Sequence, residues 1–461
     1  MPAPERPNVL VFFTDQQRWD VSGLHGCPLD LMPNFDYLAQ RGTFLANSFT
    51  CQPVCGPARA CLQTGRYATQ LGCYRNGIAL PAQARTLAHH FRTAGYRTGY
   101  IGKWHLATEE PVTAPNRGGY ESWLASNTLE FTSNAYQTVM CDEENRPVFL
   151  PGYRVDAMAD ATIRFVHAHR EEPFFLFTSY IEPHFQNHLD DYPPPFGYRE
   201  RYASRWLPPD LLALPGSQHQ HWAGYCGMVK RLDEALGRLM DALISLRLDQ
   251  RTIILFTTDH GCHFKTRNSE YKRSCHESCI RLPTMLHGGP FTGGGRLDQL
   301  TSLIDLPPTL LDGAGLPVPG DMMGRSVLPL TRGQTAGWQD DVFLEISEAQ
   351  VGRALRTSRW KYSVIAPDKK GGQDMRGGTY REDCLYDLAA DPYELRNLVE
   401  SAAHAPVRDE LRRRLLARLA SVGETAEITT SPTKPSGQRR VALDEALDPS
   451  PWRAFTQLPR G

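Results

Sequence analysis

Three short apolar runs, each ended by polar residues, constrain the fold of this chain more than any other feature. They cover residues 9–13, 173–180 and 252–257. A strand buried on both faces of a parallel sheet reads as such an unbroken apolar run. Sheets of this kind bind ligands beyond the carboxyl ends of their strands. We therefore expect an α/β protein with a mostly parallel sheet and a functional site at that edge.

The intervening segments indicate how the sheet is covered. Apolar residues recur at helical spacing in residues 33–42, 82–95, 155–170 and 219–246. Residues 107–150 show no clear periodicity, and we interpret them as loops near the site.

The C-terminal part of the chain predicts a second, smaller unit. Residues 342–346, 354–357 and 361–365 read as successive antiparallel strands, and a helix is expected over residues 406–421. We divide the 461 residues into a catalytic domain (1–335), a small α+β domain (336–425) and a tail (426–461) that packs loosely or makes an oligomer contact.

Composition excludes several classes of protein. The formal net charge of -1 argues against bulk binding to nucleic acid or membrane. The chain has no apolar run of about 18 residues and no signal-peptide core near its N-terminus. Eleven scattered cysteines without a CxxC pair predict neither a disulfide framework nor a zinc site. We expect a reduced, cytoplasmic protein.

The segment from Cys51 to Tyr67 predicts an anion site. Pro57 suits the first turn of a helix and Gly56 allows a tight approach, so Cys55 is expected at a helix N-terminus. The partial positive charge there and Arg59, one turn on, favour an anion. Because the cysteine-to-arginine spacing differs from the Cys-x5-Arg loop of thiol phosphatases, a plain thiolate mechanism fits poorly.

Chemically active side chains follow the predicted strands. Lys103 and His105 come after strand 96–101, and His184 follows strand 173–180; such residues bind an oxyanion or move a proton. Exposed loops with chance charges are the alternative interpretation.

Two acidic strand ends predict a metal site. Asp15 and Gln16 end one buried strand, and Asp259 and His260 end another. Their oxygen and nitrogen atoms can close around one divalent cation, although either pair alone could be a turn.

A basic loop follows the second acidic pair. It contains Lys272 and four further candidates for binding an anionic substrate: His263, Lys265, Arg267 and His276. A solvated basic loop is the alternative interpretation. The basic residues, with aromatic residues over 192–206, favour a sugar or other small anionic alcohol as the substrate.

These motifs together resemble the type I sulfatases. The segment from Cys55-Gly-Pro-Ala-Arg59 to Thr64-Gly-Arg66 resembles their C-x-P-x-R signature and its downstream T-G-R. Further matching motifs are GKWHL at 102–106, Pro183-His184, Lys272 with His276-Glu277 and Arg281-Leu-Pro283, and LYDL-DP-E-N over 385–397.

The resemblance implies a fold and a mechanism. The fold is an alkaline-phosphatase-like three-layer sandwich with a small C-terminal α+β domain carrying an antiparallel sheet. A maturation enzyme oxidises the cysteine to Cα-formylglycine, whose hydrate attacks sulfur. By this resemblance Ca²⁺ is held by Asp15, Gln16, residue 55, Asp259 and His260. Arg59, Lys103, His184 and Lys272 neutralise charge, with His184 as proton donor, and His105 takes a proton from the hydrate.

The metal pairs depart from the common family pattern, which has Asp and Asn where this chain has Gln16 and His260. This departure resembles the choline-sulfatase and phosphonate monoester hydrolase branch, and a nitrogen ligand suits Mn²⁺ or another divalent cation as well. Three functions follow: a sulfate-ester hydrolase, a phosphonate or phosphate ester hydrolase, or a non-catalytic relative whose Cys55 is never oxidised.

Overall fold

A ten-stranded sheet forms the centre of the protein, seen in a computed structural model that describes residues 6–293 and 295–430. The strand order is β10-β2-β9-β8-β1-β7-β3-β4-β5-β6, and neighbouring strands from β8 to β4 run parallel. The strands are β1 (Asn8–Thr14), β2 (Thr43–Phe49), β3 (Arg97–Lys103), β4 (Ser122–Ser126), β5 (Thr138–Cys141), β6 (Pro147–Leu150), β7 (Phe174–Ser179), β8 (Thr252–Thr258), β9 (Arg281–His287) and β10 (Arg296–Ser302).

The three apolar runs form adjacent central strands. Val9 of β1 lies in register with Phe175 of β7 on one side and with Ile253 of β8 on the other. Every residue of these strands is buried, as continuous apolar sequence predicts. Because the strands are parallel and in register, their carboxyl ends meet at one edge.

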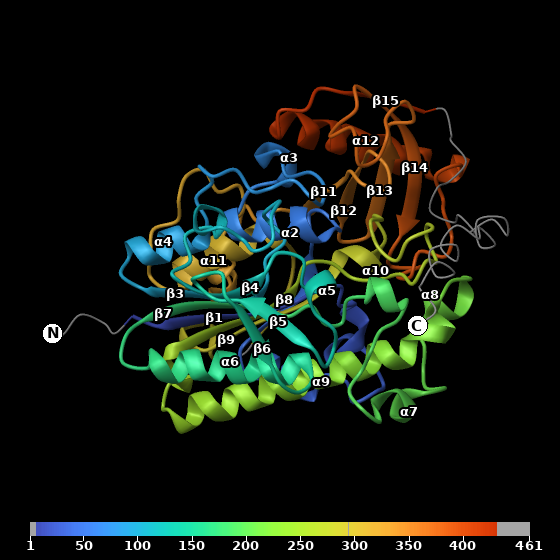
Figure 1. Cartoon of the computed structure of the whole chain (residues 1–461). Helices are drawn as coiled ribbons and strands as arrows, with labels where there is room; N and C mark the ends of the chain where they lie inside the picture. The colour runs from blue at the N-terminus through green and yellow to red at the C-terminus, as the bar shows by residue number, and fades with distance from the viewer. Residues whose placement is uncertain (1–5, 294, 431–461) are drawn as a thin grey trace.

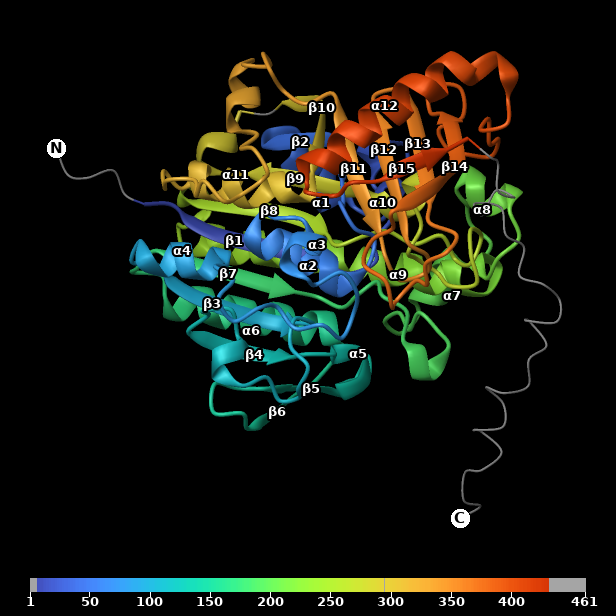
Figure 2. The ribbon, with the colours of Figure 1, turned by 90° about the horizontal axis from the view of Figure 1, so that it is seen from above.

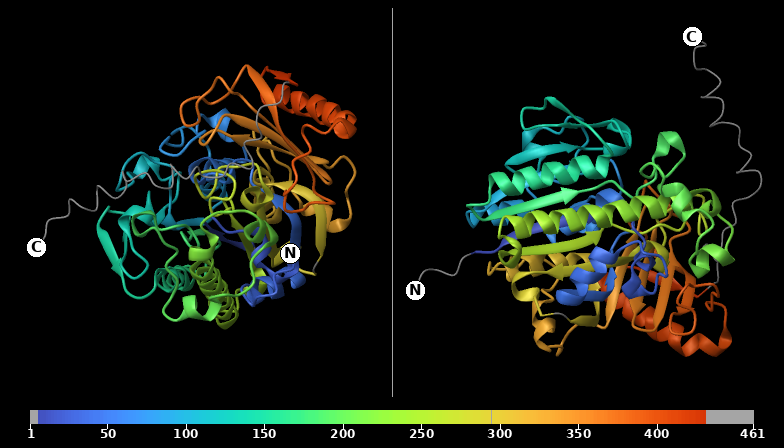
Figure 3. Two further views of the ribbon diagram at one scale, coloured as in Figure 1. Left: turned by 90° about the vertical axis from the view of Figure 1, so that its right-hand side faces the viewer. Right: turned by 90° about the horizontal axis from the view of Figure 1, so that it is seen from below.

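Helices cover both faces of this sheet. Helices α6 (Arg154–Ala168) and α9 (Gln218–Ser245) run side by side along one face, with α1 (Pro33–Arg41) beside α9 (Figures 1 and 3). The opposite face carries α2 (Cys55–Thr64), α4 (Leu87–Thr93) and α11 (Leu306–Gly313) (Figure 1). The predicted three-layer α/β fold is confirmed.

The second, five-stranded sheet lies beyond the β10 side of the large one, where β11 contacts β10 (Figure 2). Its strands are β11 (Asp341–Ile346), β12 (Gly352–Thr357), β13 (Trp360–Ile365), β14 (Thr379–Asp387) and β15 (Glu427–Thr429), and α12 (Ala405–Ser421) packs against it. The first four strands are antiparallel; β11, β12 and β13 were predicted, whereas β14 was not. Strand β15 lies within the segment expected to be a tail; residues 431–461 of that tail lie outside the described part.

The expectation of loops over residues 107–150 is wrong. This segment contributes β4, β5 and β6 to the large sheet and the short helix α5 (Leu129–Thr132). Their sequences, such as TVMC and PVFL, are too short to show periodicity, and pairing with β3 and with one another stabilises them.

Among the described helices, none is both long and apolar enough to cross a bilayer.

Candidate active site

Cys55 begins helix α2, as its Gly-Pro neighbours predict. The preceding Val54 is extended, and residues 55–64 are helical and fully buried. Arg59, one turn on, donates through Nη2 to Asp15 Oδ2 at 2.9 Å and through Nη1 to Ser179 Oγ at 2.7 Å. The start of α2 is thereby fixed to the carboxyl ends of β1 and β7.

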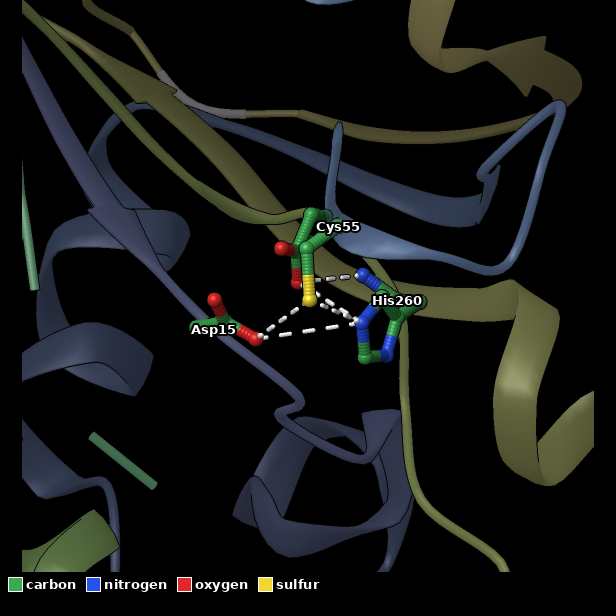
Figure 4. Close-up of side chains that lie close together, drawn as sticks. Asp15, Cys55 and His260 are labelled. Atoms are coloured by element: carbon green, nitrogen blue, oxygen red, sulfur yellow. Dashed lines mark hydrogen bonds and ion pairs between the residues drawn. The ribbon is translucent and has the colours of Figure 1, made fainter. Parts of the chain in front are cut away.

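Four of the five predicted metal ligands face one another. Single ligand atoms of Asp15, Cys55, Asp259 and His260 all lie within 4.8 Å of one another, and all four residues are buried. Figure 4 shows the Asp15, Cys55 and His260 side chains pointing to a common centre. Nδ1 of His260 lies 2.8 Å from the Gly261 carbonyl, which fixes it as the N–H donor and leaves Nε2 facing Cys55 Sγ at 3.2 Å.

The side chain of Gln16 points elsewhere. Its Nε2 donates to the Tyr192 hydroxyl at 2.7 Å, and its Oε1 accepts from the Phe185 amide at 3.4 Å. Its backbone N–H instead donates to Asp259 Oδ1 at 3.0 Å. These contacts do not support Gln16 as a side-chain ligand; they make it a residue that orients Asp259.

The donor set fits a divalent cation. Burial, and after it the Asp15 carboxylate, raises the pKa of Asp259 to about 7, so two carboxylates are held close together away from water. A divalent cation between them removes this repulsion, and two carboxylates with one imidazole suit manganese or zinc as well as calcium.

Two lysines approach the same point. Nζ of Lys103 lies 2.9 Å from both Asp15 Oδ2 and Glu130 Oε1, and Nζ of Lys272 lies 2.7 Å from Cys55 Sγ. Burial would lower the pKa of each lysine, but the carboxylate of Asp15 beside Lys103 and the thiolate of Cys55 beside Lys272 raise it instead. Both lysines are therefore cations at neutral pH.

The same cations act on the thiol of Cys55. Burial would raise its pKa, but Lys103, Lys272 and His260 hold the pKa well below its usual range, with a hydrogen bond from His105. Residue 55 thus lies where negative charge is stabilised.

The two predicted proton-transfer histidines differ in their contacts. Nδ1 of His184 lies 2.6 Å from the Phe185 carbonyl and Nε2 lies 3.1 Å from Lys272 Nζ. Burial, and then Lys272, lowers the pKa of His184, so its neutral ring accepts a hydrogen bond from Lys272 through Nε2. His105 is buried, and its Nδ1 has no hydrogen-bond partner in the part of the chain that is described.

Three of the four predicted substrate-binding residues are bonded inside the protein. His263 Nε2 lies 3.1 Å from the Lys272 carbonyl, and Arg267 donates to the Tyr393 and Glu394 carbonyls. His276 lies 3.2 Å from the Tyr386 hydroxyl. These contacts indicate structural roles and leave Lys265, which is partly exposed, as the one candidate for contacting a substrate.

Sequence reasoning missed Glu130 and Ser179. Glu130 lies in α5, inside the segment interpreted as loops, so no strand end marked it. Ser179 is the last residue of β7, so its position at a strand end could have identified it. The prediction at this strand end named His184 instead.

A cavity of about 660 Å³ opens beside α5, the helix that carries Glu130. It lies at the carboxyl end of β4, because its walls come from α5, the start of β5 and the end of β6. Phe131, Tyr136 and Phe149, which are 66%, 53% and 74% exposed, line it. The cavity offers aromatic surfaces at the edge that carries the cations.

The fold and this site together define a member of the alkaline-phosphatase-like superfamily. A family model described as Sulfatase matches residues 7–316, and one described as N-sulphoglucosamine sulphohydrolase, C-terminal, matches residues 269–421. The chain belongs to the sulfatase family and is a sulfuric ester hydrolase, an enzyme that hydrolyses sulfate esters.

Curated relatives agree with the family assignment, and solved structures agree with the fold. The ulvan-active sulfatase of Formosa agariphila is 26% identical over 445 residues, covering 91% of this chain and 82% of that protein. A structure in complex with its substrate D-glucosamine-2-N,6-O-disulfate matches with a TM-score of 0.73 and 21% identity over 91% of this chain and 98% of that one. The structure of the phosphonate monoester hydrolase of Agrobacterium radiobacter matches with a TM-score of 0.66 and 23% identity, over 90% of this chain and 96% of that one.

Proposed function

We propose that the protein hydrolyses a sulfate ester. Its nucleophile is residue 55, which a maturation enzyme oxidises to Cα-formylglycine. Asp15, Asp259 and His260 bind a divalent cation beside it. The observation that supports this most directly is the convergence on residue 55. Its Sγ lies 2.7 Å from Lys272 Nζ, 3.2 Å from His260 Nε2 and 3.5 Å from Asp15 Oδ1.

The chain's own residues would bind and orient the sulfuryl group. When present, the cation supplies Lewis acidity and the hydrated aldehyde supplies the attacking oxygen. Lys103 approaches from the end of β3 and Lys272 from the loop after β8, and both would neutralise the sulfuryl oxygens. Arg59 holds Asp15 in place and adds positive charge at the start of α2.

Proton transfer is assigned to two groups. Nζ of Lys272 carries the proton that the leaving alkoxide needs, and Nε2 of His184, 3.1 Å away, orients it. We therefore assign the donor to the Lys272–His184 pair rather than to His184 alone. His105, beside residue 55, would take the proton from the second hydroxyl of the hydrate, which expels sulfate and restores the aldehyde.

The alcohol part of the substrate is proposed to be a sugar or another small ring-bearing alcohol. Support comes from the aromatic cavity beside Glu130, because ring faces of sugars stack on aromatic side chains. Lys265 is the basic-loop residue available to bind an additional negative charge on such a substrate.

A phosphonate or phosphate ester hydrolase is the second candidate function. It is favoured by His260 in the cation site, where the common sulfatase pattern has an oxygen ligand. A non-catalytic role is disfavoured because Asp15, Lys103 and Lys272 are all present and all approach residue 55. We also propose a reducing, cytoplasmic location, because the ten cysteines other than residue 55 form no disulfide in the structure.

The deciding experiment asks whether residue 55 loses its sulfur. The protein is co-expressed with a formylglycine-generating enzyme, and the tryptic peptide from Gly42 to Arg59 is analysed by mass spectrometry. We expect the aldehyde, hydrolysis of an aryl sulfate, and a folded but inactive Cys55→Ala variant. A free thiol in cells that convert a known sulfatase, or comparable esterase activity of Cys55→Ala, would contradict the proposal.

A further inference from the structure

Glu130 places a negative charge among the cations of a site for anions. Its Oε1 lies 2.9 Å from Lys103 Nζ, and both side chains are buried, with exposed fractions of 5% and 0%. Its Oε2 is buried and has no hydrogen-bond partner among the described residues. Glu130 is also separate from the candidate metal group, which contains Asp15, Cys55, Asp259 and His260.

The carboxylate is ionised and held in place. Burial alone would raise the pKa of Glu130, but Lys103, followed by His105 and His184, lowers it to about 2. Gln186, which follows β7, donates through Nε2 to the Glu130 carbonyl at 2.6 Å and so fixes α5 beside the site.

Glu130 shares Lys103 with the substrate. Lys103 is bonded to Asp15 and to Glu130, each at 2.9 Å, so its charge is balanced before a substrate arrives. A group bound through Lys103 would lie about 6 Å from Glu130, the length of two hydrogen bonds. At that separation the negative charge of Glu130 repels negative charge on the reacting group.

Sulfate and phosphate monoesters differ in the charge they carry. A sulfate ester is a monoanion, whereas a phosphate monoester is close to a dianion above pH 7. One extra charge about 6 Å from a carboxylate, at an effective dielectric constant of about 20, is disfavoured about 100-fold. Screening by solvent reduces the factor, so we expect at least about tenfold.

We propose that Glu130 is a specificity-determining residue: its fixed negative charge beside Lys103 makes the site select monoanionic sulfate esters over dianionic phosphate monoesters. The inference rests on the proposed function, because it requires the reacting ester to bind beside Lys103. It names the substrate class as singly charged esters of a tetrahedral oxyacid.

The test compares three esters of one phenol at pH 8: the sulfate, a phosphonate monoester and the phosphate monoester. The first two are monoanions and the third is a dianion. The matured wild-type enzyme is compared with Glu130→Gln, which removes the charge, and with Glu130→Asp, which keeps it. Glu424→Gln, which breaks a buried ion pair with Arg353 in the small sheet, controls for a general loss of stability.

We expect Glu130→Gln to raise the phosphate-to-sulfate ratio of kcat/KM at least tenfold and to leave the phosphonate-to-sulfate ratio unchanged. Glu130→Asp and Glu424→Gln should keep the wild-type ratios even where both rates fall. If Glu130→Gln does not fold, Glu130→Ser removes the same charge with a smaller side chain.

Three results would overturn the inference. An unchanged phosphate-to-sulfate ratio in the charge-removing variant, with sulfate hydrolysis intact in the wild type, contradicts the role of Glu130 alone. An equal gain for the phosphonate monoester also contradicts it, because the gain would not depend on charge. A matured wild-type enzyme that hydrolyses no sulfate ester would remove the proposed function and this inference together.

Discussion

Replacing Gly102 by alanine tests how closely the backbone of β3 positions Lys103. Gly102 has a φ of +109°, and a Cβ atom at this position would lie 2.1 Å from the Ser179 carbonyl oxygen and 2.5 Å from Met158 Cε. Gly102 and Ser179 are paired in register between β3 and β7. Alanine therefore cannot be accommodated unless the two strands separate locally.

The size of the effect follows from this geometry. To reach the 3.0 Å that real Cβ atoms require, the backbone must move by 3.0 − 2.1 = 0.9 Å. The unfavourable φ costs about 1–2 kcal/mol, and the clash about as much again, so we expect a loss of about 3 kcal/mol in the free energy of unfolding. A displacement of about 1 Å at a positioning residue can cost about 100-fold in rate.

The assay measures urea unfolding and kcat/KM for an aryl sulfate with matured enzyme. The matched control is Gly72→Ala, because Gly72 has a φ of +76° but a Cβ atom there would meet nothing within 4 Å among the described residues. That control should lose about 1 kcal/mol and keep its activity. If Gly102→Ala behaves like Gly72→Ala in both stability and activity, the reasoning is refuted.

Three further predictions concern the cation, a buried ion pair and a buried acid. Chelation by EDTA should abolish hydrolysis and lower the melting temperature, with Ca²⁺ or Mn²⁺ restoring both; activity that survives exhaustive chelation would contradict the cation site. Lys361→Met should cost about 3–5 kcal/mol in urea unfolding, because Glu394 loses the cation it is paired with and Glu277 keeps only Arg356, and a loss below about 1 kcal/mol would disagree. Burial raises the pKa of Asp305 from 3.8 to about 6, so its stabilising contribution is present below pH 4 and is lost as the pH rises through 6. Asp305→Asn should remove a pH-dependent difference of about 2 kcal/mol between pH 4 and pH 7, and parallel pH profiles of the two proteins would refute this.

The parts of the fold that the sequence predicted are those with strong local signals. Strands β1, β7 and β8 are buried on both faces and therefore read as unbroken apolar runs. Strands β2 and β9 were not predicted, although they join the same sheet. Their sequences, TFLANSF and RLPTMLH, mix polar and apolar residues, and pairing with neighbouring strands, rather than local preference, determines their structure.

The candidate site shows the same division. Residues at strand ends, such as Asp15, Lys103 and Asp259, could be predicted to converge because parallel strands share one edge. In the basic loop, charge alone does not identify a substrate-binding residue, because His263 and Arg267 bond backbone carbonyls. A positive side chain in a sequence does not reveal whether its partner will be a substrate or the protein itself.

The basic loop connects the LYDL-DP-E-N motif of the small domain, residues 385–397, to the candidate active site. Unlike Lys103, Lys272 lies in a loop and not at the end of a strand. The loop is fixed by contacts of His263 and Asn268 with the Lys272 carbonyl. That loop is held from the other side by the small domain, where Arg267 donates to the carbonyls of residues 393 and 394 and the Glu277 amide donates to Glu394 Oε2 at 2.7 Å. Because a displaced loop would carry Lys272 away from residue 55, the turn around Glu394 supports the reaction without touching a substrate. The small domain is therefore expected to be required for activity and not only for stability.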